Sequence, residues 1–156
     1  SNWNYTSKPM KKEPTKPDWM AEVDVLVPFH DVDCLMVTWH GHYLKYFEIA
    51  RTALLNKINY DYPQMKESNI IWPVVEAHLK YIKPALYGAL LKVTAEIVIY
   101  EYKLKIDYVI KNASNGEKIC KGYTVQVPVS PITGQITFQT PPILLECLGL
   151  KKKSHG

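Results

Sequence analysis

The chain has 156 residues, of which 47% are hydrophobic and 22% are charged, and its formal net charge is +4. This length suits one domain with one core, and this balance excludes an intrinsically disordered chain. The sequence has no apolar run near the roughly 20 residues that a membrane helix needs. Because its first residues also lack the charged-then-apolar order of a signal peptide, we expect a cytoplasmic protein without a membrane partner.

The positive charge is concentrated at the two ends of the chain. Residues 1–17 sum to +3 and the C-terminal lysines add another +3, which leaves −2 for residues 18–150. A folded surface that tracks phosphates would carry its positive charge in the body, so we expect no nucleic acid partner. The expected organisation is a flexible N-terminal arm at 1–18, one domain at 19–148 and a basic C-terminal tail at 149–156.

The first half of the body contains one predicted strand and one predicted helix. Alternating apolar residues predict a half-buried strand over 21–29, and a loop without a clear period follows over 31–39. A helix is expected over about 41–57, where apolar residues recur at the helical period: Tyr43, Phe47, Ala50 and Leu54. We expect this helix to pack against the sheet that the remaining segments form.

The second half consists of predicted strands after a polar connection. These strands cover residues 70–81, 90–100, 102–110, 117–129 and 135–140. A turn of the hairpin kind is expected at 112–116. One early strand, one long helix and four or five antiparallel strands predict an α+β fold, in which a curved antiparallel sheet wraps around the helix.

The segment from Val27 to Arg51 carries the most specific motif. It contains His-Asp-Val-Asp, a short linker, His-Gly-His-Tyr-Leu and then Phe-Glu-Ile-Ala-Arg. A strand that ends in Asp-x-Asp, followed by a short loop and a helix with this opening, resembles the signature of the 4-hydroxybenzoyl-CoA thioesterase branch of the hotdog superfamily. A second block, from Val74 to Gly88, is similar to the strand–turn–strand of that family. The resemblance covers roughly residues 21–140 and implies the hotdog fold.

The resemblance implies an acyl thioesterase that hydrolyses an acyl-CoA or acyl carrier protein thioester to a free acid and a thiol. Asp33 matches the catalytic aspartate, as nucleophile or as general base on water, and His40 matches the position whose backbone N–H donates to the thioester oxygen. Such chemistry needs a carboxylate and oxyanion donors, which a helix start supplies. Asp31 is expected in a turn or salt bridge. Glu48 is a secondary catalytic candidate, against a surface ion pair with Arg51 or Lys45.

Three further residues are expected to contact the acyl group. Tyr43 matches a tyrosine of the family and is expected to lie half in the core and half in the pocket wall. Met36 stands where the family commonly has glycine, so it is expected to change the acyl-chain preference. His42 replaces an asparagine that is usual in relatives.

Partners and cofactors also follow from the resemblance. It implies a homodimer or homotetramer with sheets aligned edge to edge and the substrate at the subunit interface. Coenzyme A or phosphopantetheine enters as part of the substrate, so neither a metal nor another cofactor is expected. The candidates for contact with the coenzyme A phosphates are Lys80, Lys83 and Lys103.

Two other functions stay open. A hotdog 3-hydroxyacyl carrier protein dehydratase needs a His–acid pair in a motif rich in proline and glycine, which the sequence lacks. A non-catalytic acyl-thioester-binding protein would bind its ligand in the same groove as the enzyme's substrate, but the presence of Asp33 favours the enzyme.

Cys34 is disfavoured as a nucleophile because a thiol needs an activating neighbour. Cys34, Cys120 and Cys147 are expected to be free thiols.

Overall fold

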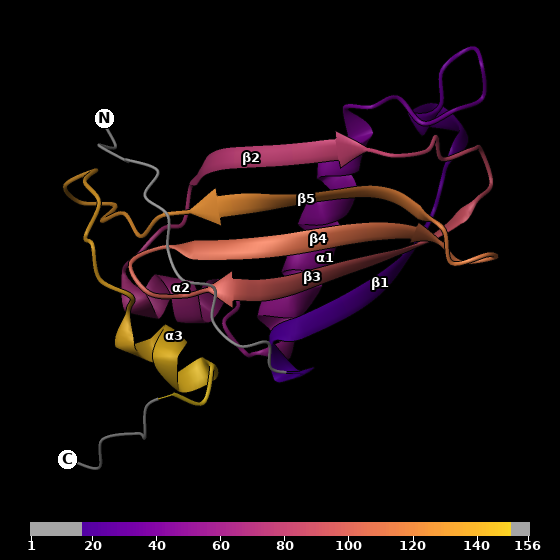
Figure 1. Ribbon diagram of the computed structural model, residues 1–156. Helices are drawn as coiled ribbons and strands as arrows, with labels where there is room; N and C mark the ends of the chain where they lie inside the picture. Colours follow the sequence, from indigo (N-terminus) through magenta and orange to yellow (C-terminus); the bar gives the residue numbers. More distant parts are fainter. Residues whose placement is uncertain (1–16, 151–156) are drawn as a thin grey trace.

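The computed structural model describes residues 17–150, so the predicted arm at 1–18 and tail at 149–156 lie largely outside the described residues. Five strands form one antiparallel sheet in the order β1-β3-β4-β5-β2 (Figure 1). The strands are β1 (Met20–Leu26), β2 (Val74–Tyr81), β3 (Leu90–Ile99), β4 (Leu104–Asn112) and β5 (Lys118–Gln126). The helices are α1 (His42–Lys57), α2 (Tyr62–Ser68) and α3 (Pro142–Cys147), with short 3-10 turns at Pro17–Trp19 and Phe29–Asp31.

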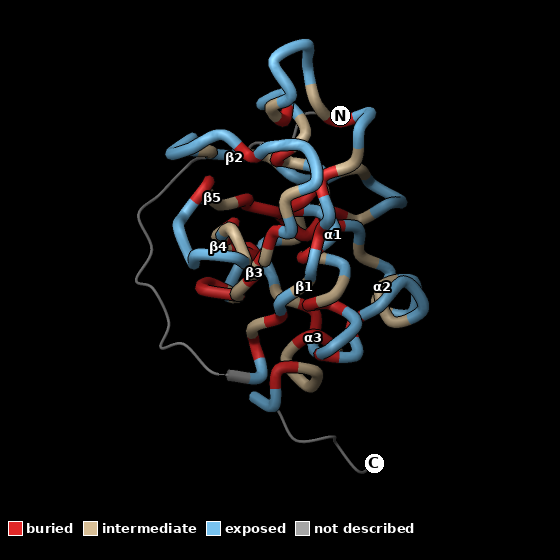
Figure 2. The backbone as a smooth tube through the Cα atoms, turned by 90° about the vertical axis from the view of Figure 1, so that its right-hand side faces the viewer, coloured by how far each residue is buried: buried red, intermediate tan, exposed pale blue. Residues whose placement is uncertain are grey.

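The sheet and α1 enclose the core. Strand β4 alternates buried and half-buried residues over most of its length, as expected for a sheet with one face on the core. The buried face of α1 packs against β1 and β3, and the ring of Phe47 stacks on that of Tyr108 with 4.5 Å between centroids. A Cβ at Gly122 of β5 would overlap the backbone carbonyl of His78 on β2 and would also meet the Phe47 ring at 3.0 Å, so glycine permits the close packing on both sides. Figure 2 shows buried residues gathered between α1 and the strands.

The α+β hotdog architecture and the long helix are confirmed. The helix predicted over about 41–57 is α1, and the predicted hairpin turn joins β4 to β5. Gly116 adopts a φ of 72° in that turn, a conformation that glycine reaches without steric cost.

Several predicted boundaries are wrong, and prolines or left-handed residues explain most of them. The first strand ends at Leu26 rather than at residue 29, because Pro28 precedes a 3-10 turn. The strand predicted from residue 70 begins at Val74, after Pro73. Tyr102 has a φ of 63° and lies before β4 rather than in it.

Two short helices were missed and one predicted strand is not formed. Asp61 starts α2, where its side chain accepts a hydrogen bond from the backbone N–H of Tyr62 within a capping box. Helix α3 starts with a proline in its first turn, a position that suits proline. The segment 135–140 makes an isolated bridge from Ile136 to Val129 and no regular strand.

Strand β2 forms one edge of the sheet. Each of its eight residues is exposed or half-buried, and it pairs only with β5 among the described strands (Figure 1). The backbone of an edge strand presents one side without a ladder partner. This edge is therefore a ready surface for pairing with another strand.

Candidate active site

The loop before α1 folds back on itself as a tight hairpin. Val32 bridges to Thr38, and the backbone N–H of Asp33 donates to the carbonyl of Val37 at 2.9 Å. The carboxylate of Asp33 accepts a hydrogen bond from the backbone N–H of Leu35 at 2.8 Å. This turn fixes Asp33 at the loop tip, where the residue is exposed.

Met36 occupies a left-handed position in this hairpin. Its φ is 62°, and its backbone N–H donates to the Asp33 carbonyl at 2.9 Å. A side chain makes this conformation costly, whereas glycine adopts it freely. The glycine that the family resemblance implies at this position would fit this backbone, whereas Met36 adds a side chain that is 42% exposed beside Asp33.

The start of α1 offers unused backbone donors. The first helical residue is His42, with Gly41 as its N-cap, so the helix begins two residues later than His40. Within residues 17–150, the backbone N–H groups of His40 and Gly41 donate no hydrogen bond. The Trp39 ring lies across Gly41, where a Cβ would overlap it. The hydroxyl of Tyr81 donates to the His40 carbonyl at 3.3 Å and ties this segment to β2.

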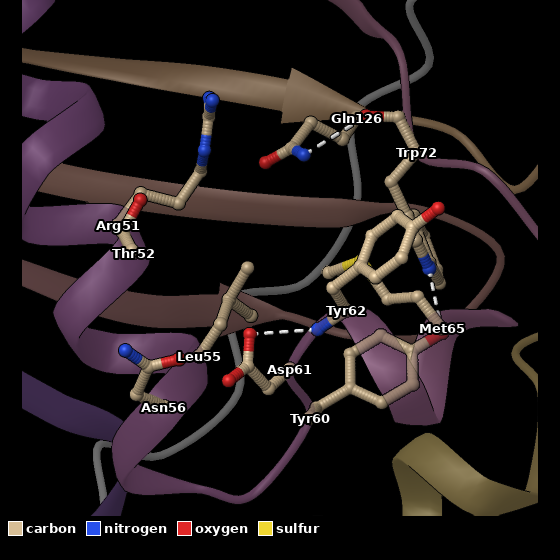
Figure 3. A pocket seen from close by; sticks show the side chains of 10 residues that line it. All are labelled: Arg51, Thr52, Leu55, Asn56, Tyr60, Asp61, Tyr62, Met65, Trp72 and Gln126. Carbon is tan, nitrogen blue, oxygen red and sulfur yellow. Dashed lines mark hydrogen bonds between the residues drawn. The ribbon is translucent and has the colours of Figure 1, made fainter.

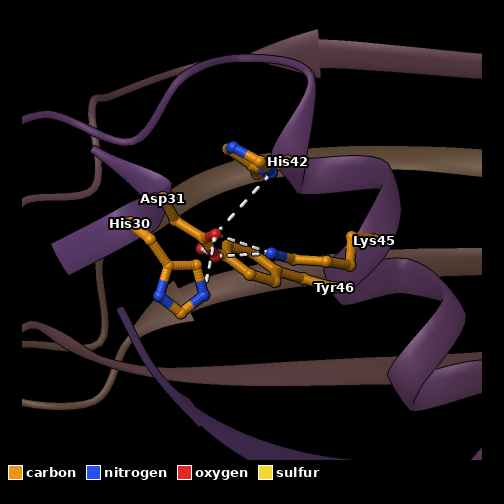
Figure 4. A network of polar contacts seen from close by, with 5 residues as sticks. All are labelled: His30, Asp31, His42, Lys45 and Tyr46. Atoms are coloured by element: carbon orange, nitrogen blue, oxygen red, sulfur yellow. Dashed lines mark hydrogen bonds and ion pairs between the residues drawn. The ribbon is translucent and has the colours of Figure 1, made fainter. Parts of the chain in front are cut away.

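Asp31 anchors the base of the same loop (Figure 4). Its fully buried carboxylate accepts hydrogen bonds from the Lys45 ammonium at 2.6 and 2.8 Å and from the Tyr46 hydroxyl at 2.6 Å. Burial alone raises the pKa of Asp31, but the bonds from Lys45 and Tyr46 outweigh it and hold the pKa below its ordinary value of 3.8. The salt-bridge role expected for Asp31 is confirmed.

The imidazoles of His30 and His42 approach the same carboxylate. His30 Nε2 lies 3.6 Å and His42 Nδ1 lies 3.8 Å from Asp31 Oδ1. His42 also meets the Trp39 ring edge-on, with 5.4 Å between centroids. His42 therefore lies between the Asp31 anchor and the exposed aromatic ring at the helix start.

Tyr43 is buried in the described chain, and Glu48 lies on its surface. Tyr43 is only 3% exposed, and its hydroxyl accepts a hydrogen bond from the Ala85 backbone N–H at 3.1 Å. Burial raises the pKa of Tyr43, and the side chain belongs to the core cluster of the described residues. Its place in the wall of an acyl pocket stays a prediction. Glu48 is exposed and lies 3.9 Å from Arg51, which is the surface ion pair considered from the sequence.

The remaining sequence candidates are also placed. Lys80 is exposed on β2, Lys83 forms an ion pair with Glu117 at 2.9 Å, and Lys103 is 8% exposed. A mostly buried ammonium is a poor surface contact for a phosphate, so Lys103 is the weakest of the three.

The three cysteines are free, and Cys34 is exposed. The described part of the chain contains no group of three His, Cys, Asp or Glu that could hold a metal ion, and none of its helices is long and apolar enough to cross a membrane.

A cleft of about 280 Å³ lies beside the second half of α1 (Figure 3). Its lining comes from α1, the connection to α2, α2 itself, the segment before β2 and the end of β5: Arg51, Thr52, Leu55, Asn56, Tyr60, Asp61, Tyr62, Met65, Trp72 and Gln126. No local pattern in the sequence indicates this cleft. The signal that could have found it is Gln126, a polar residue between Val125 and Val127 in an otherwise apolar run.

Comparison with known proteins places this geometry in a family. The family model described as the thioesterase-like superfamily matches residues 27–143. A Synechocystis protein provisionally named an esterase is 31% identical over 129 residues, which cover 81% of this chain and 77% of that protein. A Bacillus subtilis protein provisionally named an acyl-CoA thioesterase is 25% identical over 118 residues, which cover 76% of this chain and 75% of that protein.

Solved structures share the fold at low sequence identity. A 1,4-dihydroxy-2-naphthoyl-CoA thioesterase from Synechocystis superposes with a TM-score of 0.75 at 17% identity, covering 83% of this chain and 96% of the other. A DHNA-CoA thioesterase from Staphylococcus aureus gives a TM-score of 0.73 at 24% identity, covering 83% and 89%. The chain therefore belongs to the thioesterase-like superfamily, and it is a thioester hydrolase with the hotdog fold.

Proposed function

We propose that the protein hydrolyses acyl-CoA thioesters with Asp33 as the reacting carboxylate and the backbone N–H of His40 as a donor to the carbonyl oxygen. The observation that carries this proposal is the pairing, in a thioesterase-like chain, of an exposed loop-tip carboxylate with unused amides at a helix start. Amide donors at a helix start favour the negative charge that develops on the carbonyl oxygen. The relative provisionally named an acyl-CoA thioesterase favours coenzyme A over a carrier protein.

Two routes fit these residues. Asp33 either attacks the carbonyl carbon, which expels the thiolate and leaves an anhydride that water cleaves, or it takes a proton from water that attacks the carbon. Both routes yield a free acid and a thiol, and both need the oxyanion donors. A single turnover in ¹⁸O-labelled water identifies the first route when water attacks the aspartyl carbon of the anhydride, because the label then stays on Asp33 and the bridging Asp33 oxygen enters the acid. Trapping of the anhydride with hydroxylamine identifies the first route when water attacks the acyl carbon instead.

A second copy of the chain completes the site in this proposal. Tyr81, at one end of β2, contacts His40, whereas Val74, at the other end, pairs with Gln126 beside the cleft. Antiparallel pairing of two β2 edges would put Tyr81 of the second copy beside Val74 of the first. The Asp33 loop of one copy would then face the cleft of the other, and the acyl group would lie between them.

The remaining site residues have smaller proposed roles. Met36 contacts the acyl chain near the reacting carbon, because its exposed side chain lies next to Asp33 in the loop. His42 lies at the helix start and helps to orient the thioester. Glu48 is proposed as a surface residue on the path of the acyl group rather than as the reacting carboxylate, because it is exposed and lies near Arg51. The proposed reaction is a hydrolysis and requires no redox cofactor.

Thiol release from a panel of acyl-CoA thioesters tests the proposal. The purified protein is incubated with short, long, branched and aromatic acyl-CoA, and free thiol is measured with a thiol reagent. We expect turnover of at least one class and lower or no turnover of the matching acyl carrier protein substrate. Binding of acyl-CoA without thiol release would contradict hydrolysis and favour the binding-protein alternative, and dehydration of a 3-hydroxyacyl substrate would favour the dehydratase.

Sedimentation at graded protein concentrations tests the shared site. We expect a dimer or tetramer whose activity per chain falls as dilution separates the copies, because each site needs the edge of a second copy. Full activity of a single dissociated chain would contradict this arrangement.

A further inference from the structure

We propose that His42 is the acid that protonates the leaving sulfur of the thioester, and that Asp31 is the positioning residue that orients its imidazole. The imidazole belongs to the first residue of α1, and its Nδ1 lies 3.8 Å from Asp31 Oδ1 (Figure 4). This inference rests on the proposed function, because it adds a group to the same reaction. His42 then moves a proton in addition to orienting the thioester.

The Asp31 carboxylate is a fixed and ionised acceptor. Lys45 donates to both of its oxygens and the Tyr46 hydroxyl donates to Oδ2, which fixes the orientation of the carboxylate. Burial opposes the charge, but these bonds hold the pKa of Asp31 below its ordinary value, so the group is ionised at neutral pH. An ionised carboxylate only accepts hydrogen bonds. The nitrogen of His42 that faces it, Nδ1, therefore carries a hydrogen, and any second proton is gained and lost at Nε2.

Two neighbours restrict the His42 ring. The 3.8 Å between Nδ1 and Asp31 Oδ1 is an ion-pair distance and is longer than a hydrogen bond. Contacts of catalytic groups are often long without substrate and shorten when it binds. The Trp39 ring meets the imidazole edge-on from another side, with 5.4 Å between centroids. The carboxylate and the indole together limit the orientations that the imidazole can take.

The thioester sulfur is expected at the same helix start. In the proposed function the carbonyl oxygen accepts from the His40 backbone N–H, and His42 follows two residues later. The sulfur is bonded to the carbonyl carbon, so it lies near both residues. The His42 side chain is 30% exposed, so a substrate can reach the ring and water can restore its proton. The His40 ring lies against the rings of Trp39 and Tyr81, whereas the His42 ring has a carboxylate beside one nitrogen.

The proton transfer balances in both routes of the proposed hydrolysis. When the carbon–sulfur bond breaks, its electron pair passes to sulfur, and the proton on His42 Nε2 moves to that sulfur to give the free thiol. His42 is left neutral with its hydrogen on Nδ1, and solvent returns a proton to Nε2. The attacking group is the same as before, either Asp33 or a water molecule that Asp33 deprotonates.

An asparagine at position 42 isolates the nitrogen that transfers the proton. His42→Asn can place an amide N–H where Nδ1 faces Asp31, but it has no counterpart to Nε2. The family resemblance implies asparagine at this position, so the fold should tolerate the change. His30→Gln is the matched control, because His30 Nε2 lies 3.6 Å from the same Asp31 oxygen but its 79% exposed ring comes from the 3-10 turn rather than from α1.

Two thioesters of one acyl group measure the effect of the leaving thiol. The first carries N-acetylcysteamine, an alkyl thiol that matches the reacting end of coenzyme A, and the second carries 4-nitrothiophenol, whose thiolate leaves readily without a proton. The value of kcat/KM includes the departure of sulfur in both routes. We expect His42→Asn to lower kcat/KM by about 10²-fold for the alkyl thioester and only slightly for the aryl thioester. His30→Gln should stay near the wild type with both. Equal losses with both thioesters in His42→Asn, or no loss, would overturn the inference.

A binding measurement on the wild-type protein needs neither turnover nor a folded variant. In protein with ¹⁵N-labelled histidine, the nitrogen resonances should show that neutral His42 carries its hydrogen on Nδ1. Addition of coenzyme A should shift the Nε2 resonance, because the thiol then lies beside it. A hydrogen on Nε2 of neutral His42, or an Nε2 resonance that bound coenzyme A leaves unchanged, would overturn the inference.

The outcomes separate the two proposals. Thiol release by the wild type, with the same loss in His42→Asn for both thioesters, would leave the proposed function standing and remove the inference. Wild-type turnover in Asp33→Asn, together with a loss in His42→Asn that depends on the leaving thiol, would keep the inference and remove Asp33 from the proposed function.

Discussion

At the base of the loop before α1, Asp31 is fully buried and held by Lys45 and Tyr46. At the tip of the loop Asp33 is exposed, and its carboxylate accepts a hydrogen bond from the Leu35 backbone N–H. The two carboxylates are two residues apart and belong to one motif. Their surroundings give the two carboxylates different roles, since the buried charge holds the loop in place and the exposed charge stays accessible to a substrate. The same residue type thus serves stability at one position and, in the proposed function, chemistry at the other.

The largest effect expected from this comparison is on turnover at the tip. Asp33→Asn should lower kcat by about 10²–10⁴-fold, because an amide neither attacks a thioester nor takes a proton from water. Its oxygen can still accept the Leu35 hydrogen bond, so the melting temperature should stay close to that of the wild type. Thiol release and circular dichroism measure the two quantities. Wild-type turnover in Asp33→Asn would exclude Asp33 as the reacting group.

The next largest effect is on stability at the base. Asp31→Asn removes the charge that Lys45 and Tyr46 bond, so the free energy of unfolding should fall by about 2 kcal/mol. Urea denaturation provides the measurement. The residual turnover of the folded fraction should exceed that of Asp33→Asn, and the reverse order would exchange the roles of the two aspartates.

Acid should weaken the base of the loop in a defined direction. The pKa of Asp31 is lower in the folded protein than its ordinary value of 3.8, so its contribution to stability is present above about pH 4 and is lost as the pH falls through the folded pKa. Urea denaturation between pH 3 and pH 6 should show a smaller acid-induced loss in Asp31→Asn than in the wild type. Equal losses in both proteins would mean that Asp31 does not contribute to the acid sensitivity.

The smallest effect is expected beside the tip. Met36→Gly relieves a left-handed side chain at a φ of 62° and should raise the free energy of unfolding by about 0.5–1 kcal/mol, after the entropy that glycine costs. Met36→Ala keeps a Cβ in that conformation and serves as the control, with little change in stability. Both variants should broaden the acyl-chain preference in the thiol-release assay if Met36 contacts the substrate. Destabilisation by glycine would show that the methionine side chain contributes more packing than strain.

Local patterns predicted most of the fold and the position of the loop. The helical period identified α1, alternation identified the sheet strands, and the Asp-x-Asp motif identified the loop before the helix. The family resemblance, rather than a local pattern, separated the expected roles of Asp31 and Asp33 and placed Tyr43 half in the core and half in a pocket wall. The burial of Tyr43 depends on Ala85, 42 residues away, which no local pattern reveals.

The cleft could not be predicted, because its parts come from distant segments. Arg51 appeared in the sequence as a helix-surface residue, and Gln126 appeared only as one position in a predicted strand. The unpaired amide oxygen becomes evident only when Trp72 is seen to take the amide nitrogen. Such an oxygen is found only by checking, in three dimensions, which buried polar atoms lack a hydrogen-bond partner.

The most direct measurement is a crystal structure with a coenzyme A thioether that keeps the acyl carbonyl. We expect the carbonyl oxygen to lie about 2.7–3.1 Å from the His40 backbone nitrogen, with the Asp33 carboxylate beside the carbonyl carbon or one water away. An acyl group bound away from both, with its carbonyl turned from the start of α1, would contradict the central claim.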